Sequence, residues 1–150
     1  MTTLVGIPLQ LSEAKLNRKT KEKNMNTAIT ILVTLVALEH AYFLILEMFL
    51  WNKPTGRKTF GLTEQFAKDT QSLAANQGLY NGFLAAGLLW SLVQSNAHFA
   101  FQLQVFFLSC IIVAAVFGAA TVKRQILFIQ GVPALLAFIF VLIKPALSFS

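Results

Sequence analysis

The chain has 150 residues, enough for one domain, and 56% of them are apolar while only 12% are charged. A soluble domain carries roughly 25% charged residues, so this composition excludes an ordinary soluble domain and indicates a membrane protein. The single cysteine, Cys110, excludes an intramolecular disulfide, and with two histidines it cannot build a zinc cluster. The net charge of +6 does not indicate nucleic acid, because five of the twelve basic residues lie in the first 24 positions. A basic tail on an apolar chain is more typical of a membrane-surface or orientation signal.

A basic N-terminal extension, residues 1–24, is followed by four apolar windows. About 20 apolar residues cross the hydrocarbon core of a bilayer. The windows are Ala28–Trp51, Leu73–Val93, Phe99–Val122 and Ile126–Ile143. In lipid each must be helical, because its backbone N–H and C=O groups have no other partners. Residues 25–150 are therefore predicted to form a single all-α, integral membrane domain. Since the second and third connections are short, the expected architecture is an antiparallel four-helix bundle of four transmembrane helices.

The first connection, Asn52–Ser72, is long and polar. Pro54 and Gly56 predict a turn in it. Thr63 can then cap a helix in which Glu64 and Lys68 pair at i,i+4. We expect this helix to begin outside the membrane and to continue into the second span.

Basic residues in the connections predict the orientation. The first and third connections carry Lys53, Arg57, Lys58, Lys68, Lys123 and Arg124. By the positive-inside rule these two connections face the cytoplasm and both termini are extracytoplasmic. The basic extension contradicts this, because it would hold the N-terminus inside. One interpretation is that translation starts at Met25 and residues 1–24 are not translated. The alternative is a genuine cytoplasmic tail on a protein of reverse or mixed orientation.

Several segments resemble a known family. They are "ALEH" and "LEMFLW" in the first span, "GRKTFGLT" in the first connection, "LAANQGLYNGFLAAGL" in the second span, "GAATVKR" and "QGVPALLA". Together they resemble the uncharacterised small integral membrane proteins of domain of unknown function 1304, over nearly everything from Met25 to the fourth span. The resemblance implies a bacterial-type, four-span membrane protein, and we expect it in the cytoplasmic membrane as a multi-pass protein. It supplies no activity and no catalytic residues.

Three polar groups interrupt the first span: Glu39, His40 and Glu47. An ionised side chain at mid-bilayer costs roughly 2.5–3.5 kcal/mol on insertion scales. At about 100° per residue the three fall within an arc of about 100°, so all can face the bundle interior. This clustering predicts a proton-titrating or ligand-binding site around Glu39. The structural alternatives are that Glu47 reaches the interface near Arg57 or Lys53, and that His40 pairs with a neighbour.

Small residues recur every four positions in the second span, at Ala74, Gly78, Gly82 and Ala86. They predict a helix-packing seam at which another helix, or a second copy in a homodimer, approaches closely. Polar candidates for the ligand-binding site lie beside it: Asn76, Gln77, Tyr80, Asn81 and, from the fourth span, Gln130. Each of these can instead be interhelical hydrogen-bonding glue. Pro133 predicts a kink near Gln130.

Three functional classes stay open from the residues alone. The first is binding and translocation of a small solute or cation, with Glu39 exchanging protons. The second is an intramembrane enzyme on a lipophilic substrate, with Glu39, His40 and Glu47 as acid and base and with Tyr80 and Asn81 among the orienting groups. The third is a structural or accessory subunit. A metal site from two glutamates and one histidine is a weak signal, and no metal, cofactor or nucleic acid is predicted. The lipid bilayer is the expected partner.

Overall fold

A computed structural model describes residues 6–148 of the chain, with side chains described from Ser12 to Lys144. Over that range the chain is helical, without a strand. The elements are α1 (Gly6–Phe49), α2 (Pro54–Phe60), α3 (Glu64–Asp69), α4 (Gln71–Val93), α5 (Ala97–Thr121), the π-helical turn η1 (Leu127–Gly131) and α6 (Val132–Ser148).

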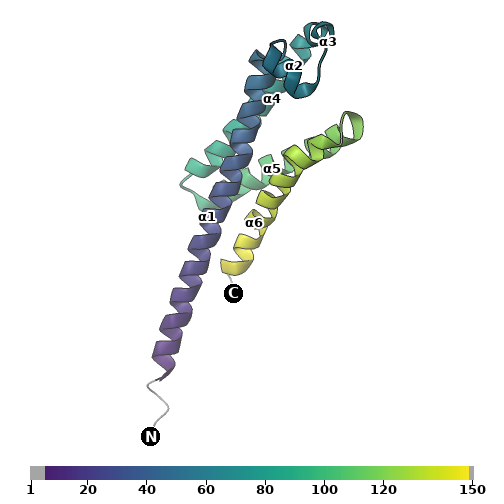
Figure 1. Cartoon of the computed structure of the whole chain (residues 1–150). Coiled ribbons are helices and arrows are strands. Elements are labelled where there is room, and N and C mark those ends of the chain that lie inside the picture. Colours follow the sequence, from purple (N-terminus) through teal and green to yellow (C-terminus); the bar gives the residue numbers. More distant parts are fainter. Residues whose placement is uncertain (1–5, 149–150) are drawn as a thin grey trace.

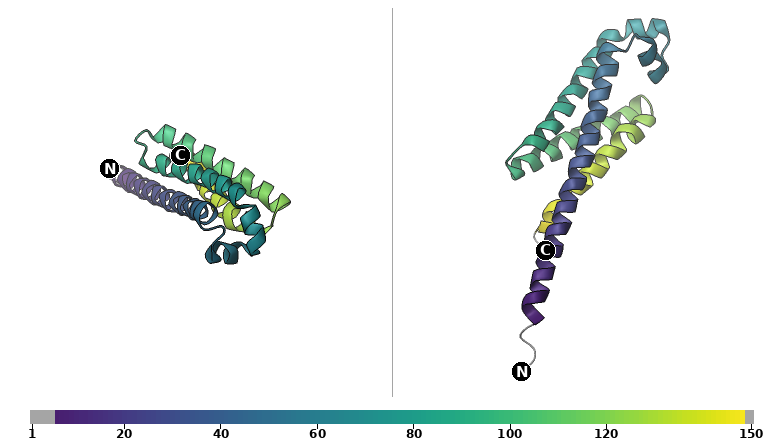
Figure 2. Two further views of the ribbon diagram at one scale, coloured as in Figure 1. Left: turned by 90° about the horizontal axis from the view of Figure 1, so that it is seen from above. Right: turned by 60° about the vertical axis from the view of Figure 1, so that its left-hand side comes forward.

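The long helices run alternately up and down (Figure 1). α1 rises from the N-terminal end to α2 and α3, α4 returns, α5 rises again and α6 descends. α1 contacts α4 and α6, and α5 contacts the same two helices. Seen from above, the short helices α2 and α3 lie together at one end (Figure 2, left). The first and third connections are thereby on one side of the molecule, as their shared basic character predicts.

Among the described residues, three helical stretches are long and apolar enough to cross a membrane: Ser12–Phe49, Ala97–Thr121 and Leu127–Lys144. α4, the predicted second span, is a 23-residue helix. It is long enough, at about 1.5 Å per residue, to cross the hydrocarbon core. Its amides and hydroxyls keep it below the apolarity of the other three. The structure therefore shows an all-helical chain with three candidate spans, and the fourth span stays a prediction.

The core is formed jointly by the four long helices. Ile29, Val33, Val36 and Ala37 of α1 meet Leu88 of α4, Leu108 and Ile111 of α5, and Ala134, Ala137 and Val141 of α6. The residues from α1, α5 and α6 are spaced mainly three or four positions apart, which places each of these sets along one stripe of its helix. The outer surfaces of the same helices carry large exposed aliphatic and aromatic side chains, the pattern of helices that face lipid.

The predicted extension continues the first helix. α1 is unbroken from Gly6, and its N-terminal part projects beyond the other helices (Figure 2, right). Side chains from Ser12 to Lys21 are exposed, whereas Met25 packs against the core. Residues 1–5 lie outside the described part. A translation start at Met25 stays a prediction.

Two predictions for the first connection are wrong. Pro54 and Gly56 do not form a turn but lie in α2, where Pro54 occupies the first turn and needs no intrahelical donor. The helix capped by Thr63 does not continue into the second span, because it ends at Asp69 and Thr70 leaves helical geometry at φ −106° and ψ 6°. The Thr63 cap itself is confirmed, since its hydroxyl accepts from the Phe66 amide at 3.3 Å.

A π-helical turn, Leu127–Gly131, precedes Pro133. Proline has no N–H to donate, which favours a local departure from α-helical bonding one turn earlier. This is the position at which the sequence predicts a kink near Gln130.

Candidate functional site

The contact between α1 and α4 holds one carboxylate and one amide together. Asn81 Nδ2 donates a hydrogen bond of 2.7 Å to Glu47 Oε2. Asn81 is buried, whereas Glu47 is partly buried. Among the described residues Glu47 forms no ion pair with Arg57 or Lys53, and Arg57 pairs with Glu64 at 2.7 Å. Glu47 therefore belongs to the interhelical contact rather than to the basic connection.

Glycine makes this contact short. A Cβ added at Gly78 would lie 3.0 Å from the Met48 nitrogen and 3.2 Å from the Leu44 oxygen, so the α4 backbone rests on the α1 backbone. A Cβ at Gly82 would meet only the Leu44 side chain, at 3.3 Å or more. Close backbone approach at small residues is the usual way membrane helices gain contact area. The seam is thus tightest at Gly78, beside Glu47.

The far end of the predicted seam follows a different register. Ala74 and Gly78 are buried and Gly82 is partly buried, but Ala86 is exposed and Ala85 is buried in its place. A strict repeat of four advances about 40° per step around a helix of 3.6 residues per turn. After three steps the fourth residue has rotated out of the contact.

Glu39 and His40 lie about two turns before Glu47 on α1. The His40 side chain is 1% exposed, and its Nδ1 lies 2.9 Å from the Val36 carbonyl oxygen. A carbonyl only accepts, so Nδ1 carries the proton and donates, which leaves Nε2 as the acceptor of a neutral ring. Glu39 is partly buried. The three α1 groups therefore keep the shared arc that the sequence predicts, with His40 deepest.

The other polar candidates do not all join them. Asn76, Gln77 and Tyr80 are exposed on the outer surface of α4, and Gln130 is partly buried in η1. Among the described residues, Asn81 alone of the predicted amides makes a side-chain hydrogen bond to an α1 glutamate. The structure brings Glu47 and Asn81 together, keeps His40 buried about two turns away on α1, and leaves Asn76, Gln77 and Tyr80 exposed.

The helices α2 and α3, with the residues that flank them, fold into a cap over this end of the long helices. The sequence did not predict this cap. The Trp51 indole donates to the Thr70 hydroxyl at 3.1 Å. Its ring lies tilted at 46° against the Phe60 ring, with the two centroids 4.9 Å apart. Gly56 packs directly on the Leu50 carbonyl, where a Cβ would overlap it. The Asn52 amide oxygen is buried here without a hydrogen-bond partner in the described part of the chain. The segment "GRKTFGLT" is the sequence signal for this cap.

Charges hold the cap together on its outer surface. Glu64 pairs with Lys68 at 2.8 Å and with Arg57 at 2.7 Å. Hydrogen bonds from Lys68 and Arg57 lower the pKa of Glu64 to about 2. Lys123, in the third connection, donates to the Phe60 carbonyl at 3.4 Å. The cap thus links the first connection to the third.

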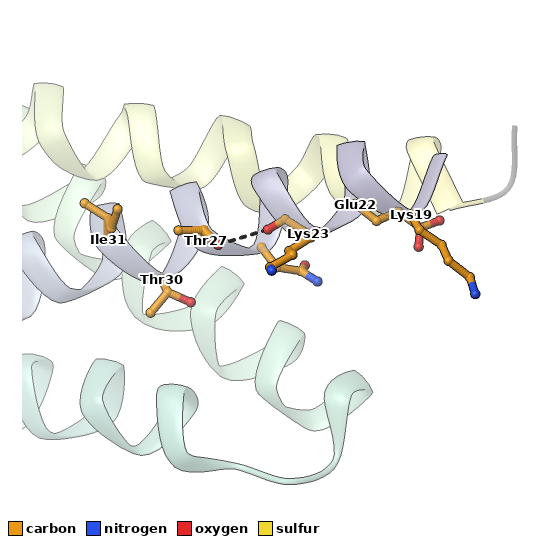
Figure 3. A pocket seen from close by; sticks show the side chains of 7 residues that line it. Lys19, Glu22, Lys23, Thr27, Thr30 and Ile31 are labelled. Atoms are coloured by element: carbon orange, nitrogen blue, oxygen red, sulfur yellow. Dashed lines mark hydrogen bonds between the residues drawn. The ribbon is translucent and has the colours of Figure 1, made fainter. Parts of the chain in front are cut away.

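The structure also has a shallow, open depression on the projecting part of α1 (Figure 3). Its lining runs from Lys19 to Ile31, all on one helix, and contains none of the predicted site residues. Within the described residues, no three histidine, cysteine or acidic side chains gather as metal ligands. The α1–α4 contact is therefore the better candidate site.

Over the described residues the chain is all-helical, with three helices long and apolar enough to cross a membrane, which is compatible with a small membrane protein. The family described as "Protein of unknown function (DUF1304)" matches residues 34–142. The chain is also similar to "Uncharacterized protein YpaA" of Lactococcus lactis subsp. lactis (strain IL1403), with 36% identity over 118 residues that cover 75% of this chain and 96% of the relative. The chain is a member of the DUF1304 family. No solved structure matches it significantly.

Proposed function

We propose that the protein binds a small solute or cation at the α1–α4 contact and exchanges protons there through Glu47 and Glu39. The observation that carries the proposal is an acid inside a candidate membrane span whose partner is a neutral amide, Asn81, at 2.7 Å. Neither Glu39 nor Glu47 forms an ion pair within the described residues. In a medium of low dielectric a carboxylate without an ion-pair partner is stabilised by binding a proton or a cation, because either one neutralises its charge.

The chemistry of the Glu47–Asn81 pair supports ligand binding rather than a purely structural hydrogen bond between helices. A glutamine would bridge to Asn81 equally well without a titratable group, and glutamate is the more expensive residue in a bilayer. His40, buried about two turns from the pair on the same helix, contributes a ring nitrogen that can accept a proton. The site therefore has two acids and one base along one side of α1.

The proposal includes a fourth span. α4 runs antiparallel to α1 and packs against it through Gly78, so a bilayer crossed by α1 also encloses α4 over the same depth. With α5 and α6 this gives an antiparallel four-helix transmembrane bundle in the cytoplasmic membrane. The buried position of Asn81 explains how α4 can carry this amide through lipid, since Asn81 faces α1 rather than the hydrocarbon.

The second candidate is an intramembrane enzyme that does acid–base chemistry on a lipophilic substrate. The specific observation in its favour is the bond from His40 Nδ1 to the Val36 carbonyl. It fixes one tautomer and presents Nε2 as a base, which is the arrangement that general-base catalysis uses. If the protein showed no transport activity, this base would favour the enzyme.

Binding of a lipophilic cation, tetraphenylphosphonium, to the purified protein in lipid nanodiscs tests the first proposal. We expect binding to increase with pH, because protons and the cation compete for the same carboxylates. Glu39→Gln and Glu47→Gln keep the shape of the side chains but cannot titrate, so they should fold and lose the pH dependence. Glu13→Gln, at an exposed position of the extension, is the matched control. A folded double variant with the parent's pH dependence would contradict the proposal.

A further inference from the structure

The cap and the third connection gather positive charge at one end of the molecule. The first and third connections hold six basic residues and two acidic ones, Glu64 and Asp69. Glu64 is paired with Arg57 and Lys68, and Asp69 accepts from the Gln65 amide at 2.8 Å. Four cations of the two connections are therefore left without an ion pair within the described residues: Lys53, Lys58, Lys123 and Arg124.

The fold turns this charge away from the body of the molecule. A Cβ added at Gly56 would overlap the Leu50 carbonyl, so this face of α2 is pressed against the end of α1. At about 100° per residue, Lys58 lies on the opposite face of the same helix. Lys123 donates to the Phe60 carbonyl at 3.4 Å, which holds the third connection against the end of α2. Figure 2 (left) shows α2 and α3 at the edge of the molecule.

Exposed apolar side chains accompany the cations. Phe66 of α3 is 53% exposed, although its neighbour Ala67 is fully buried. Phe49 near the end of α1 is 63% exposed, and Leu73 in the first turn of α4 is 71% exposed. Water suits ammonium groups but not these rings and chains. A phospholipid offers a partner to both, because its phosphate lies next to its acyl chains.

We propose that this surface of the cap binds the headgroups of anionic phospholipids, through Lys53, Lys58, Phe66, Lys123 and Arg124. The four cations contact the phosphates, and the Phe66 ring enters the boundary between headgroups and acyl chains. The combination of cations with an exposed ring favours an amphiphile over a nucleic acid or an acidic protein. The proposal requires helices that span a bilayer but no ligand between α1 and α4, so it and the proposed function can fail separately.

Quenching of Trp51 by brominated lipids measures the preference for anionic headgroups. In a Trp90→Phe background Trp51 is the one remaining tryptophan, and it packs in the cap. The full chain is reconstituted in phosphatidylcholine vesicles in which either phosphatidylglycerol or part of the phosphatidylcholine is brominated. We expect stronger quenching by the anionic lipid at equal mole fraction, and a smaller difference at high salt. Equal quenching by the two lipids would overturn the proposal.

Paired substitutions assign the preference to the cap. Lys53→Gln with Lys58→Gln removes two exposed cations that form no ion pair within the described residues, so the fold should persist. A cation near an anionic bilayer contributes up to about fivefold in affinity, and the preference for phosphatidylglycerol should fall accordingly. Lys15→Gln with Lys21→Gln makes the same change of charge in the exposed extension and should leave the preference intact. Equal losses in the two double variants would reduce the effect to net charge and contradict the proposal.

A probe on α3 tests the part of Phe66. In a Cys110→Ala background, a fluorescent label on Phe66→Cys is compared with the same label on Gln65→Cys, the neighbouring exposed position. We expect a lipid-borne quencher to reach the label at position 66 better than the label at position 65, and aqueous iodide to show the reverse order. Equal quenching of both labels by iodide would assign the cap to water or to a soluble partner and overturn the proposal.

Discussion

Asn81 is the residue on which the α1–α4 contact depends chemically. It is buried, and its amide gives Glu47 a hydrogen bond of 2.7 Å. A buried acceptor that loses its donor keeps its desolvation penalty and gains nothing in return. Asn81 and Glu47 therefore act as one unit, and a change in either residue is felt through the other.

Replacement of Asn81 by leucine tests this dependence. Asn81→Leu should lower the free energy of unfolding by roughly 1–2 kcal/mol, because Glu47 is left without its partner. Thermal unfolding in detergent measures the effect. Adding Glu47→Leu to the same chain should restore part of the stability, since the orphaned acid is then gone. Full stability in Asn81→Leu alone would show that the hydrogen bond contributes little.

Sequence reasoning placed the residues of α1 better than those of α4. Glu39, His40 and Glu47 share an arc at about 100° per residue, and the structure keeps His40 buried in that arc. Asn76 and Asn81 could not be ranked in this way, because the choice between the faces of α4 depends on how α1 packs across it. Packing at Gly78 settles the matter and turns Asn76 outward.

At the scale of elements, α1 and α4 form a pair that leaves little room for a side chain at Gly78. Gly78→Ala puts a methyl group 3.0 Å from the Met48 nitrogen and 3.2 Å from the Leu44 oxygen, so the α1 backbone would have to shift by a few tenths of an ångström. Overpacking of this kind costs about 1–3 kcal/mol. Gly82→Ala is the control, because its methyl group meets only the flexible Leu44 side chain. We expect the melting temperature in detergent to fall clearly for Gly78→Ala and little for Gly82→Ala.

The α2–α3 cap should respond to acid. The pKa of Glu64 is about 2 in the folded chain, against 4.5 ordinarily. A lowered pKa means that Glu64 stabilises the cap fully above about pH 4.5, and that this contribution is lost as the pH falls toward 2. The group is exposed, so salt should weaken the effect.

Trp51 reports on the cap because its ring packs against Phe60. In a Trp90→Phe background its fluorescence should change between pH 4.5 and about 2, and less so at high salt. Glu64→Gln should abolish this acid transition. A transition that persists in the glutamine variant would assign it to another group.

One end of the whole molecule is basic, and a hydrogen bond joins the first and third connections there. Lys123 of the third connection reaches the Phe60 carbonyl of the first, so the two connections share a side. By the positive-inside rule we expect that side in the cytoplasm. In the form that starts at Met25, a phosphatase fused after Ser150 should be active outside, and a fluorescent protein inserted after Gly61 should fluoresce inside. Activity of the C-terminal fusion in the cytoplasm would contradict this orientation.

The overall course of the chain follows from its apolar windows, whereas the cap does not. Window lengths and short connections predict the alternating helices. Thr70, at which the helix breaks after Asp69, accepts a hydrogen bond from the Trp51 indole. No local pattern reveals this contact, because the two residues are 19 positions apart. The amides of α4 lower its apolar character, and no local pattern reveals that one of them, Asn81, lies in the contact with α1.

The π-helical turn at Leu127–Gly131 bears on which changes of chain length the protein can accept. A π turn holds one residue more than an α turn, which is the result that inserting one residue into an α-helix would give. Deleting Ile129 would restore a regular α-helix and rotate the preceding segment by about 100° relative to α6. α6 is fixed in the core by Ala137 and Val141, so the third connection would turn instead and draw Lys123 away from Phe60. A relative one residue shorter in this segment would therefore have to close its cap by another contact.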